Sequence, residues 1–399
     1  MQYFIKRGDQ INGPISHQQL MGLAEKKKLK TSDLIGKSKE GHFKPNWYQL
    51  SLKSIFTLVT LSSICFCYCG IKMQQASQQR QAVKVILKSG GRVEYDYQAK
   101  SSGQTASPRW LRDLLGDDFF QEVIVVSLDW NGSLGDQQWQ QIEVLRKLKK
   151  LDLSYSSISE NRITHLAGLR DLENLSLAGS TMGDFGLEQL SRLRHLRRLD
   201  LTNTKITNAK LVRLRRLGEP VALQELHLDN NVLTSLQGLE DFTQLKELSL
   251  YGNQITSAHG LGRIRNLEKL NLFGNALTSV KDLQNLTNLK ELVLSGNQLS
   301  SIEGLEKLYQ LESLSLEGNQ LTTLQGLEEL ENLRQLYLTG NRLNSVAALF
   351  FLTQLEVIDL GWNPTLPAEQ VYKLRSSLPN CKIKWTDPAG VKSAASGHQ

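Results

Sequence analysis

The side chains best able to hold a metal ion or attack a substrate are sparse in this 399-residue chain. No two histidines have the spacing of a metal-ligand pair; they stand at positions 17, 42, 165, 195, 227, 259 and 398. The chain has no Gly-x-Ser-x-Gly element, no glycine-rich phosphate loop and no Cys–His pairing. We therefore expect no enzyme activity, no cofactor and no catalytic residue.

One histidine has acidic neighbours at the spacing of a strand. His227 lies two residues from both Glu225 and Asp229, so the three side chains share one face of an extended segment. Such a cluster can bind a metal ion, but more often it is a solvated polar patch. We expect no metal site here.

A fixed sequence frame positions most of the remaining residues. The frame Leu-x-x-Leu-x-Leu-x-x-Asn recurs every 22 residues in the second half of the chain. Its alternating leucines predict a short strand with one buried face and one free face. Its asparagine predicts a turn in which the amide bonds backbone groups of the neighbouring coil. The seven positions of this predicted structural ladder are Asn231, Asn253, Asn275, Asn297, Asn319, Asn341 and Asn363.

The frame resembles the leucine-rich repeat family, and its 22-residue period is similar to the internalin-type class. No coil can bury its leucines alone, so coils must stack into a solenoid. Earlier coils of 24 to 25 residues carry Ser156, Ser180 and Thr204 in place of Asn, and their extra length predicts a fuller helical turn on the convex side. We predict an α/β fold in which residues 123–365 form a parallel β arc of about eleven coils.

Residues 1–50 resemble a small α+β domain of the GYF type. The resemblance rests on an aromatic pair, a Gly-Pro pair, a helix opened by a Ser16-x-x-Gln19 capping box, and a later tryptophan. Family members bind proline-rich peptides on an aromatic surface. The sequence departs from the family pattern, because Tyr stands where Trp is usual and Ile15 where an aromatic is common. The alternative is that these aromatics form the core of a small domain. The implied peptide-binding residues are Tyr3, Phe4, Gly13, Pro14 and Trp47.

Residues 54–71 carry no charge, and Lys53 and Lys72 close the two ends. A helix of this length rises ~27 Å, close to the ~30 Å hydrocarbon core of a bilayer. We predict a single-pass transmembrane helix in the cytoplasmic membrane; a buried core helix is the alternative. The lysines and arginines of the N-terminal module place the N-terminus in the cytoplasm and the repeats outside it.

The two ends of the array need caps, because a terminal coil has one face without a neighbour. We expect residues 72–122 to be a linker and N-terminal cap, in which Trp110, Phe119 and Phe120 cover the open leucine edge. A helix at 371–378 and a strand at 381–385 are expected within a C-terminal cap at 366–385, and residues 386–399 are expected to be disordered.

The two-residue period of the strands predicts which side chains face away from the core. Two aromatics, Tyr251 and Phe273, fall on adjacent coils of one column, which favours a protein-binding interface. The alternative is that single exposed apolar residues are normal on any surface. The predicted partner-binding residues are Tyr251, Phe273, Val293 and Tyr337.

The net charge of +7 is mild, and we expect no nucleic-acid partner. Basic residues gather within 192–216, where a solvated convex face is a simpler reading than a contact with lipid phosphates or an acidic partner. We predict a membrane-anchored scaffold whose repeats bind a protein partner, with a proline-rich peptide as the ligand of the N-terminal module. The alternative is a cell-envelope structural or adhesion protein that binds a glycan or a neighbouring cell surface. A third hypothesis, an enzyme subunit targeted by the repeats, requires a catalytic partner that this chain does not contain.

Overall fold

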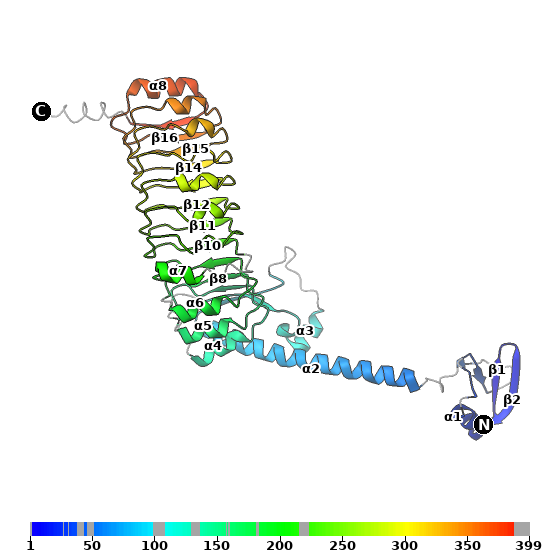
Figure 1. Ribbon diagram of the computed structural model, residues 1–399. Helices are drawn as coiled ribbons and strands as arrows, with labels where there is room; N and C mark the ends of the chain where they lie inside the picture. The colour runs from blue at the N-terminus through cyan, green and yellow to red at the C-terminus, as the bar shows by residue number, and fades with distance from the viewer. Residues whose placement is uncertain are drawn as a thin grey trace. The chain divides into compact units, whose positions relative to one another are not determined.

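The computed structural model describes residues 2–26, 28–30, 32–37, 44–45, 52–98, 108–128, 136–156, 158, 160–180, 183–214 and 223–386. The chain divides into two compact units, Met1–Gln74 and Gln75–Gln399. Figure 1 labels their helices and strands.

Residues 2–45 of the N-terminal unit contain an antiparallel sheet with the strand order β2-β1-β3-β4 and the short helix α1. The predicted capping box is confirmed: Ser16 Oγ accepts the Gln19 N–H, and the Gln19 side chain accepts the Ser16 N–H. Leu20 of the helix packs with Ile5 and Leu29 in a small core. The bounds are β1 (Gln2–Arg7), β2 (Gln10–Ser16), α1 (His17–Glu25), β3 (Leu34–Gly36) and β4 (Lys44–Pro45).

Helix α2 (Leu52–Lys88) runs for 37 residues without a break. Residues 74–87, whose pattern favours a helix that rises from the apolar run and ends at Gly90-Gly91, are helical and continuous with that run. Among the described residues, no helix has both the length and the apolarity needed to cross a membrane. The side chains of residues 54–58, at the start of the predicted transmembrane segment, lie outside the described part of the chain.

In the described part of the second unit, 13 strands form one sheet and stack in chain order (Figure 1). Only β5 and β6 pair antiparallel; every later pair is parallel, with the central leucines in register, as Leu226 with Leu248 and Leu248 with Leu270. The predicted parallel arc is thus confirmed. The bounds are β5 (Arg92–Tyr95), β6 (Val123–Ser127), β7 (Lys150–Asp152), β8 (Asn174–Ser176), β9 (Arg198–Asp200), β10 (Glu225–His227), β11 (Glu247–Ser249), β12 (Lys269–Asn271), β13 (Glu291–Val293), β14 (Ser313–Ser315), β15 (Gln335–Tyr337), β16 (Val357–Asp359) and β17 (Lys382–Lys384).

Coil length decides what forms on the side opposite the sheet. The longer early coils hold α-helices, as predicted, while the 22-residue coils have room only for turns and 3-10 segments. The α-helices are α4 (Asp136–Glu143), α5 (Glu160–Leu166), α6 (Asp184–Leu190) and α7 (Asn208–Leu214); the 3-10 segments are η4 (Leu261–Arg263), η5 (Lys281–Asn285), η6 (Leu327–Glu329) and η7 (Ala347–Phe351).

The N-terminal cap differs from the expectation. Ala82, Val83 and Ile86 of α2 are buried in the same core as the first coil, beside β5. Trp110, on α3 (Arg109–Leu115), is 67% exposed, while Phe119, in η2 (Asp117–Phe119), and the next residue, Phe120, are half-buried. The open leucine edge is therefore covered mainly by aliphatic side chains of a helix, not by the aromatics.

The C-terminal cap matches the expectation within a few residues. Helix α8 (Ala368–Ser377) buries Val371 and Leu374, and β17 adds a last parallel strand to β16. Residues 387–399, for which disorder was expected, lie outside the described residues.

The seven ladder asparagines are all buried, and their hydrogen bonds repeat from coil to coil. The Asn297 amide donates to the carbonyl oxygens of Leu294 in its own coil and Leu272 in the preceding coil, both at 2.9 Å. Its Oδ1 accepts the N–H of Leu277 at 3.0 Å. One side chain thus pairs backbone groups that would otherwise be buried without partners.

The Ser and Thr hydroxyls of the earlier coils form fewer hydrogen bonds than the asparagine amides do. Ser180 Oγ donates to the carbonyl of Ser156 at 3.1 Å, and Thr204 Oγ1 donates to the carbonyl of Leu201 at 2.6 Å. A hydroxyl has one hydrogen to donate, whereas an amide can donate two and also accept. The 22-residue coils are therefore joined by more side-chain hydrogen bonds than the early ones.

The ladder generates a stability prediction. Asn297→Ala removes a buried side chain and leaves backbone groups unpaired, so we expect the free energy of unfolding to fall by roughly 1 to 3 kcal/mol. Gln298→Ala, at the exposed next residue, is the matched control and should change it little. Urea unfolding of the full chain measures both; equal losses would show that the ladder is not structural.

Candidate functional site: the concave face

The concave face consists of the outward side chains of β7–β16 and of the residue two positions after each strand. On this face the rings of Tyr251 and Phe273 lie 5.2 Å apart between centroids, with their planes at 42°. Their exposed fractions are 38% and 40%. Val293 and Tyr337 lie on the same face and are half-buried. The structure therefore brings Tyr251 and Phe273 into one contact, here called the ring pair.

Backbone geometry holds the ring pair in place. The Tyr251 N–H donates to Asp229 Oδ1 at 2.8 Å, and the Phe273 N–H donates to Asn271 Oδ1 at 3.0 Å. Gly252 and Gly274 follow the rings with φ of 67° and 64°, a left-handed conformation that glycine adopts without strain. Each ring thus stands at a fixed point on a sharp turn.

Carboxylates on the concave face are also held by neighbours. Asp229 accepts the Ser249 hydroxyl at 2.5 Å in addition to the Tyr251 N–H. Asp359 likewise accepts the Thr339 hydroxyl at 2.7 Å and the Gly361 N–H at 3.1 Å. Such bonds restrict the side chain.

The acidic neighbours of His227 do not converge on it. Its Nε2 lies 3.7 Å from Glu247 Oε1, whereas Glu225 pairs with Arg198 and Asp229 accepts the Ser249 hydroxyl. Within the described residues, no group of three or more His, Cys, Asp or Glu side chains could hold a metal ion.

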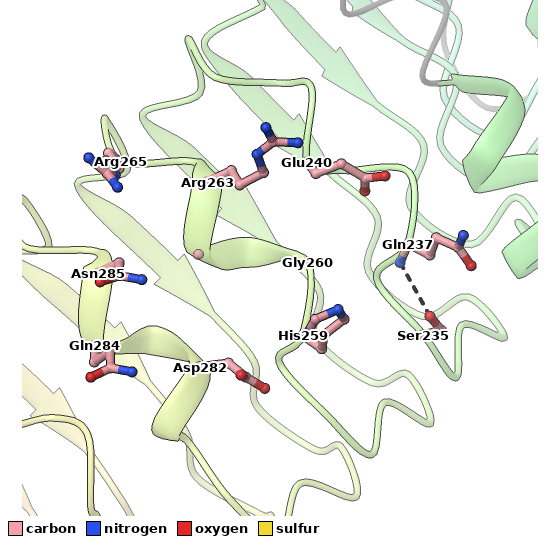
Figure 2. Close-up of a pocket in the computed structure, with 11 residues that line it drawn as sticks. Ser235, Gln237, Glu240, His259, Gly260, Arg263, Arg265, Asp282, Gln284 and Asn285 are labelled. Carbon is pink, nitrogen blue, oxygen red and sulfur yellow. Dashed lines mark hydrogen bonds between the residues drawn. The ribbon is translucent and has the colours of Figure 1, made fainter.

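A separate hollow of about 740 Å³ lies among the loops and 3-10 segments away from the sheet, and Figure 2 shows its lining. Glu240 accepts the Gly238 N–H at 2.6 Å, and Asp282 accepts the Ser257 hydroxyl at 3.4 Å. The lining is mixed in charge and contains no paired nucleophile and base. It consists of Ser235, Gln237, Glu240, His259, Gly260, Gly262, Arg263, Arg265, Asp282, Gln284 and Asn285.

In the N-terminal unit, the residues of the predicted peptide site fall on two faces. Tyr3 packs against the core and its ring lies 5.7 Å from that of His17. Phe4 is on the opposite face of β1, because neighbouring strand residues alternate. A Cβ on Gly13 would lie 3.0 Å from Phe4 Cδ1, and Pro14 beside it is exposed. Trp47 lies outside the described residues. Phe4 and Gly13 thus lie together and Pro14 is exposed next to Gly13 in the chain, while Tyr3 belongs with the core.

Sequence reasoning missed Trp362, which is 83% exposed just after the last concave-face position. It occupies the turn position that holds glycine in the five preceding coils, and it has a left-handed φ of 49°. A bulky residue in this conformation costs about 1 kcal/mol or more. The signal was present in the sequence, because Trp362 ends an unbroken column of glycines: Gly252, Gly274, Gly296, Gly318 and Gly340.

Family models match the stacked coils directly. The leucine-rich repeat model in two copies matches residues 221–262, 265–307, 287–329 and 309–350, and a second leucine-rich repeat model matches residues 192–209. These coils are leucine-rich repeats. The predicted resemblance is confirmed for the repeats, and the residues matched by these two models lie within 192–350.

Solved structures similar to this chain include proteins of Listeria monocytogenes, Leptospira interrogans and a plant. An internalin (inlF) of Listeria monocytogenes aligns with a TM-score of 0.52 and 21% identity over 69% of this chain and 92% of that one. A leucine-rich repeat protein of Leptospira interrogans has a TM-score of 0.46 and 27% identity over 61% of this chain and 62% of that one. A plant peptide hormone receptor, RGFR1, in complex with RGF2, has a TM-score of 0.43 and 20% identity over 57% of this chain and 40% of that one. No curated protein matches the chain. The internalin likeness shows the fold alone.

The exposure of Trp362 leads to a prediction about stability. Trp362→Gly removes a ring that packs little and relieves the left-handed strain, while glycine adds entropy to the unfolded chain. We expect the free energy of unfolding to change by less than about 1 kcal/mol. Trp139→Gly, at a buried tryptophan, is the contrasting control. A large loss at Trp362 in urea unfolding would make this residue structural.

Proposed function

We propose that the concave face of these leucine-rich repeats binds a protein partner, with the ring pair as its anchor. Leucine-rich repeats generally mediate protein–protein interactions, and the repeats of this chain match that family. The observation that carries the proposal is the contact between two half-exposed aromatic rings on adjacent strands. Aromatic side chains that lose their remaining exposure in a complex dominate binding energies at interfaces.

The rigidity of the face supports the same proposal. Each ring follows a strand paired on both sides and precedes a glycine turn, so little backbone freedom is lost when a partner binds. Neither ring belongs to the leucine core, so neither is needed to hold the array together.

Substitution of the ring pair tests this function. Tyr251→Ser/Phe273→Ser should leave melting nearly unchanged and weaken partner binding by ~2 kcal/mol or more. Partner capture by the full chain from crosslinked membrane extracts, followed by mass spectrometry, measures it. Tyr309→Ser/Phe351→Ser changes the same two residue types at exposed positions outside the concave face and is the matched control. If both variants capture the same proteins as the wild type, the ring pair is not the anchor. If a glycan array detects binding that only the first variant loses, the adhesion alternative replaces the protein-binding proposal.

We also propose that residues 54–71 anchor the chain in the cytoplasmic membrane, with the N-terminus in the cytoplasm and the repeats on the other side. The described side chains in this segment support it, because large apolar residues stay exposed around the helix. An apolar surface in water is unfavourable by about 25 cal/mol per Å². The exposed residues are Val59, Leu61, Ile64, Phe66, Tyr68 and Ile71.

The anchor has a direct test in cells that express the full chain. Ile64→Arg/Phe66→Arg places two charges in the apolar segment and should release the protein from carbonate-washed membranes. Gln75→Arg/Gln78→Arg places the same charges on an exposed, polar part of α2 and should leave the protein bound. Wild-type protein in the carbonate supernatant would contradict the anchor.

For the N-terminal unit, we propose that Phe4, Gly13 and Pro14 provide a surface for a proline-rich peptide. The support is the close approach of Gly13 to the Phe4 ring and the exposure of Gly13 and Pro14, whereas Ile5 and Leu20 form the core of the unit. A synthetic proline-rich peptide should shift the ring signals of Phe4 in NMR spectra of the full chain. Phe4→Ala should weaken binding about tenfold, whereas Met21→Ala, at an exposed position on α1, should not. Unchanged spectra at high peptide concentration would contradict the proposal that this surface binds a proline-rich peptide.

A further inference from the structure

The concave face is acidic, although the whole chain has a formal charge of +7. Its positions on the described strands β7–β16 carry eight carboxylates and three cations. The cations are Lys150, Arg198 and Lys269; the carboxylates are Asp152, Asp200, Glu225, Asp229, Glu247, Glu291, Glu317 and Asp359. The sign of the charge on this face is therefore opposite to that of the chain.

Two of the three cations are already matched by carboxylates of the same face. Arg198 pairs with Glu225, and Lys269 Nζ lies 2.8 Å from Glu291 Oε1, a hydrogen bond that raises the pKa of Lys269. Asp359 also lies near a cation, Lys384 of β17, at 3.7 Å. The remaining excess of negative charge includes Asp229, which accepts the Tyr251 N–H, and Glu247, four residues before Tyr251.

The position of these acids relative to the rings is set by the sheet. Glu247 is on β11, the strand that leads into Tyr251, and Glu291 is on β13, next to the strand that leads into Phe273. Asp229 touches the Tyr251 backbone directly. The ring pair is thus an apolar spot with Asp229 bonded to its backbone, and Glu247 and Glu291 lie further along the same rigid face, on either side of Lys269.

We infer that the partner contacts this face through a basic segment. In this inference, which rests on the proposed function, an apolar or arginine side chain lies on the ring pair while neighbouring lysine or arginine side chains reach the carboxylates. Arginine suits both roles, because its planar group stacks on aromatic faces and bonds carboxylates in pairs. An acidic partner is disfavoured, because like charges brought together at an interface are repelled.

The fixed carboxylates favour such a partner further. Asp229 is restrained by a hydroxyl and an N–H from the next coil, so it loses little side-chain freedom when a cation approaches. Complementary charge also speeds association and makes the binding sensitive to salt. Aromatic anchoring and charge selection are therefore combined on one surface.

A random peptide library, selected on the immobilised full chain, tests the inference. Peptides that also bind the Tyr251→Ser/Phe273→Ser chain are discarded, so that only binders dependent on the ring pair remain. We expect these to be enriched in lysine and arginine next to an apolar residue, and to bind more weakly as salt rises. Neutral or acidic binders that depend on the ring pair would overturn the inference and leave the proposed function standing. If no peptide depends on the ring pair, both the inference and the proposed function are wrong.

A charge variant makes the test specific to this face. Glu247→Gln/Glu291→Gln, at two partly exposed side chains, should weaken the selected basic peptides roughly tenfold. Glu329→Gln/Glu331→Gln changes the net charge equally at exposed positions in and beside η6, away from the concave face, and is the matched control. Equal weakening by both variants would mean that only the overall charge matters, and the inference would be wrong. A second copy of this chain as the partner would appear instead as self-association lost with the first variant alone, and would also contradict it.

Discussion

The hydrogen bonds between each ladder asparagine and the coil before it are the interaction on which the array depends. A turn of this tightness buries backbone N–H and C=O groups away from water, and each of these groups must find a partner. The Asn297 amide reaches carbonyls in two successive coils, so it joins them while the leucines fill the space between. Neither the leucine core nor the polar ladder can form within one coil, because both need the neighbour.

This dependence on neighbours also explains why function should lie on a surface. Stacking fixes the spacing of strands at about 4.8 Å, so side chains at equivalent positions on successive strands form regular columns. Tyr251 and Phe273 meet because they occupy the same column in consecutive coils. Neighbouring columns bring Asp229 and Ser249 to hydrogen-bonding distance. The result is a stiff, patterned face that suits recognition of a macromolecule.

The two coil lengths give the array two kinds of convex side. Coils of 24 to 25 residues have enough chain for α-helices such as α5 and α6, whereas 22-residue coils leave room only for turns or 3-10 segments. The early coils also use hydroxyls in place of the amide, as at Ser180 and Thr204. The longer coils thus depend more on helix packing and the shorter ones more on the ladder, although both share one continuous core.

The amino-acid sequence by itself determined the repeats, the strand positions and the contact of the ring pair. It could do so because a fixed period of 22 residues and the alternation of a strand convert sequence position directly into place on the sheet. The capping box at Ser16 was equally local, since its donors and acceptors lie within four residues.

Only the tertiary structure decided the features that depend on distant residues or on turn conformation. Helix α2 covers the first coil through Ala82 and Ile86 because β5 and β6 bring that edge to it, which no local pattern encodes. Tyr3 is drawn into a core shared with Leu20, so it separates from Phe4. The acidic character of the concave face likewise emerged only when carboxylates from seven coils were set in register, because charges dispersed along a chain become a surface only after it folds.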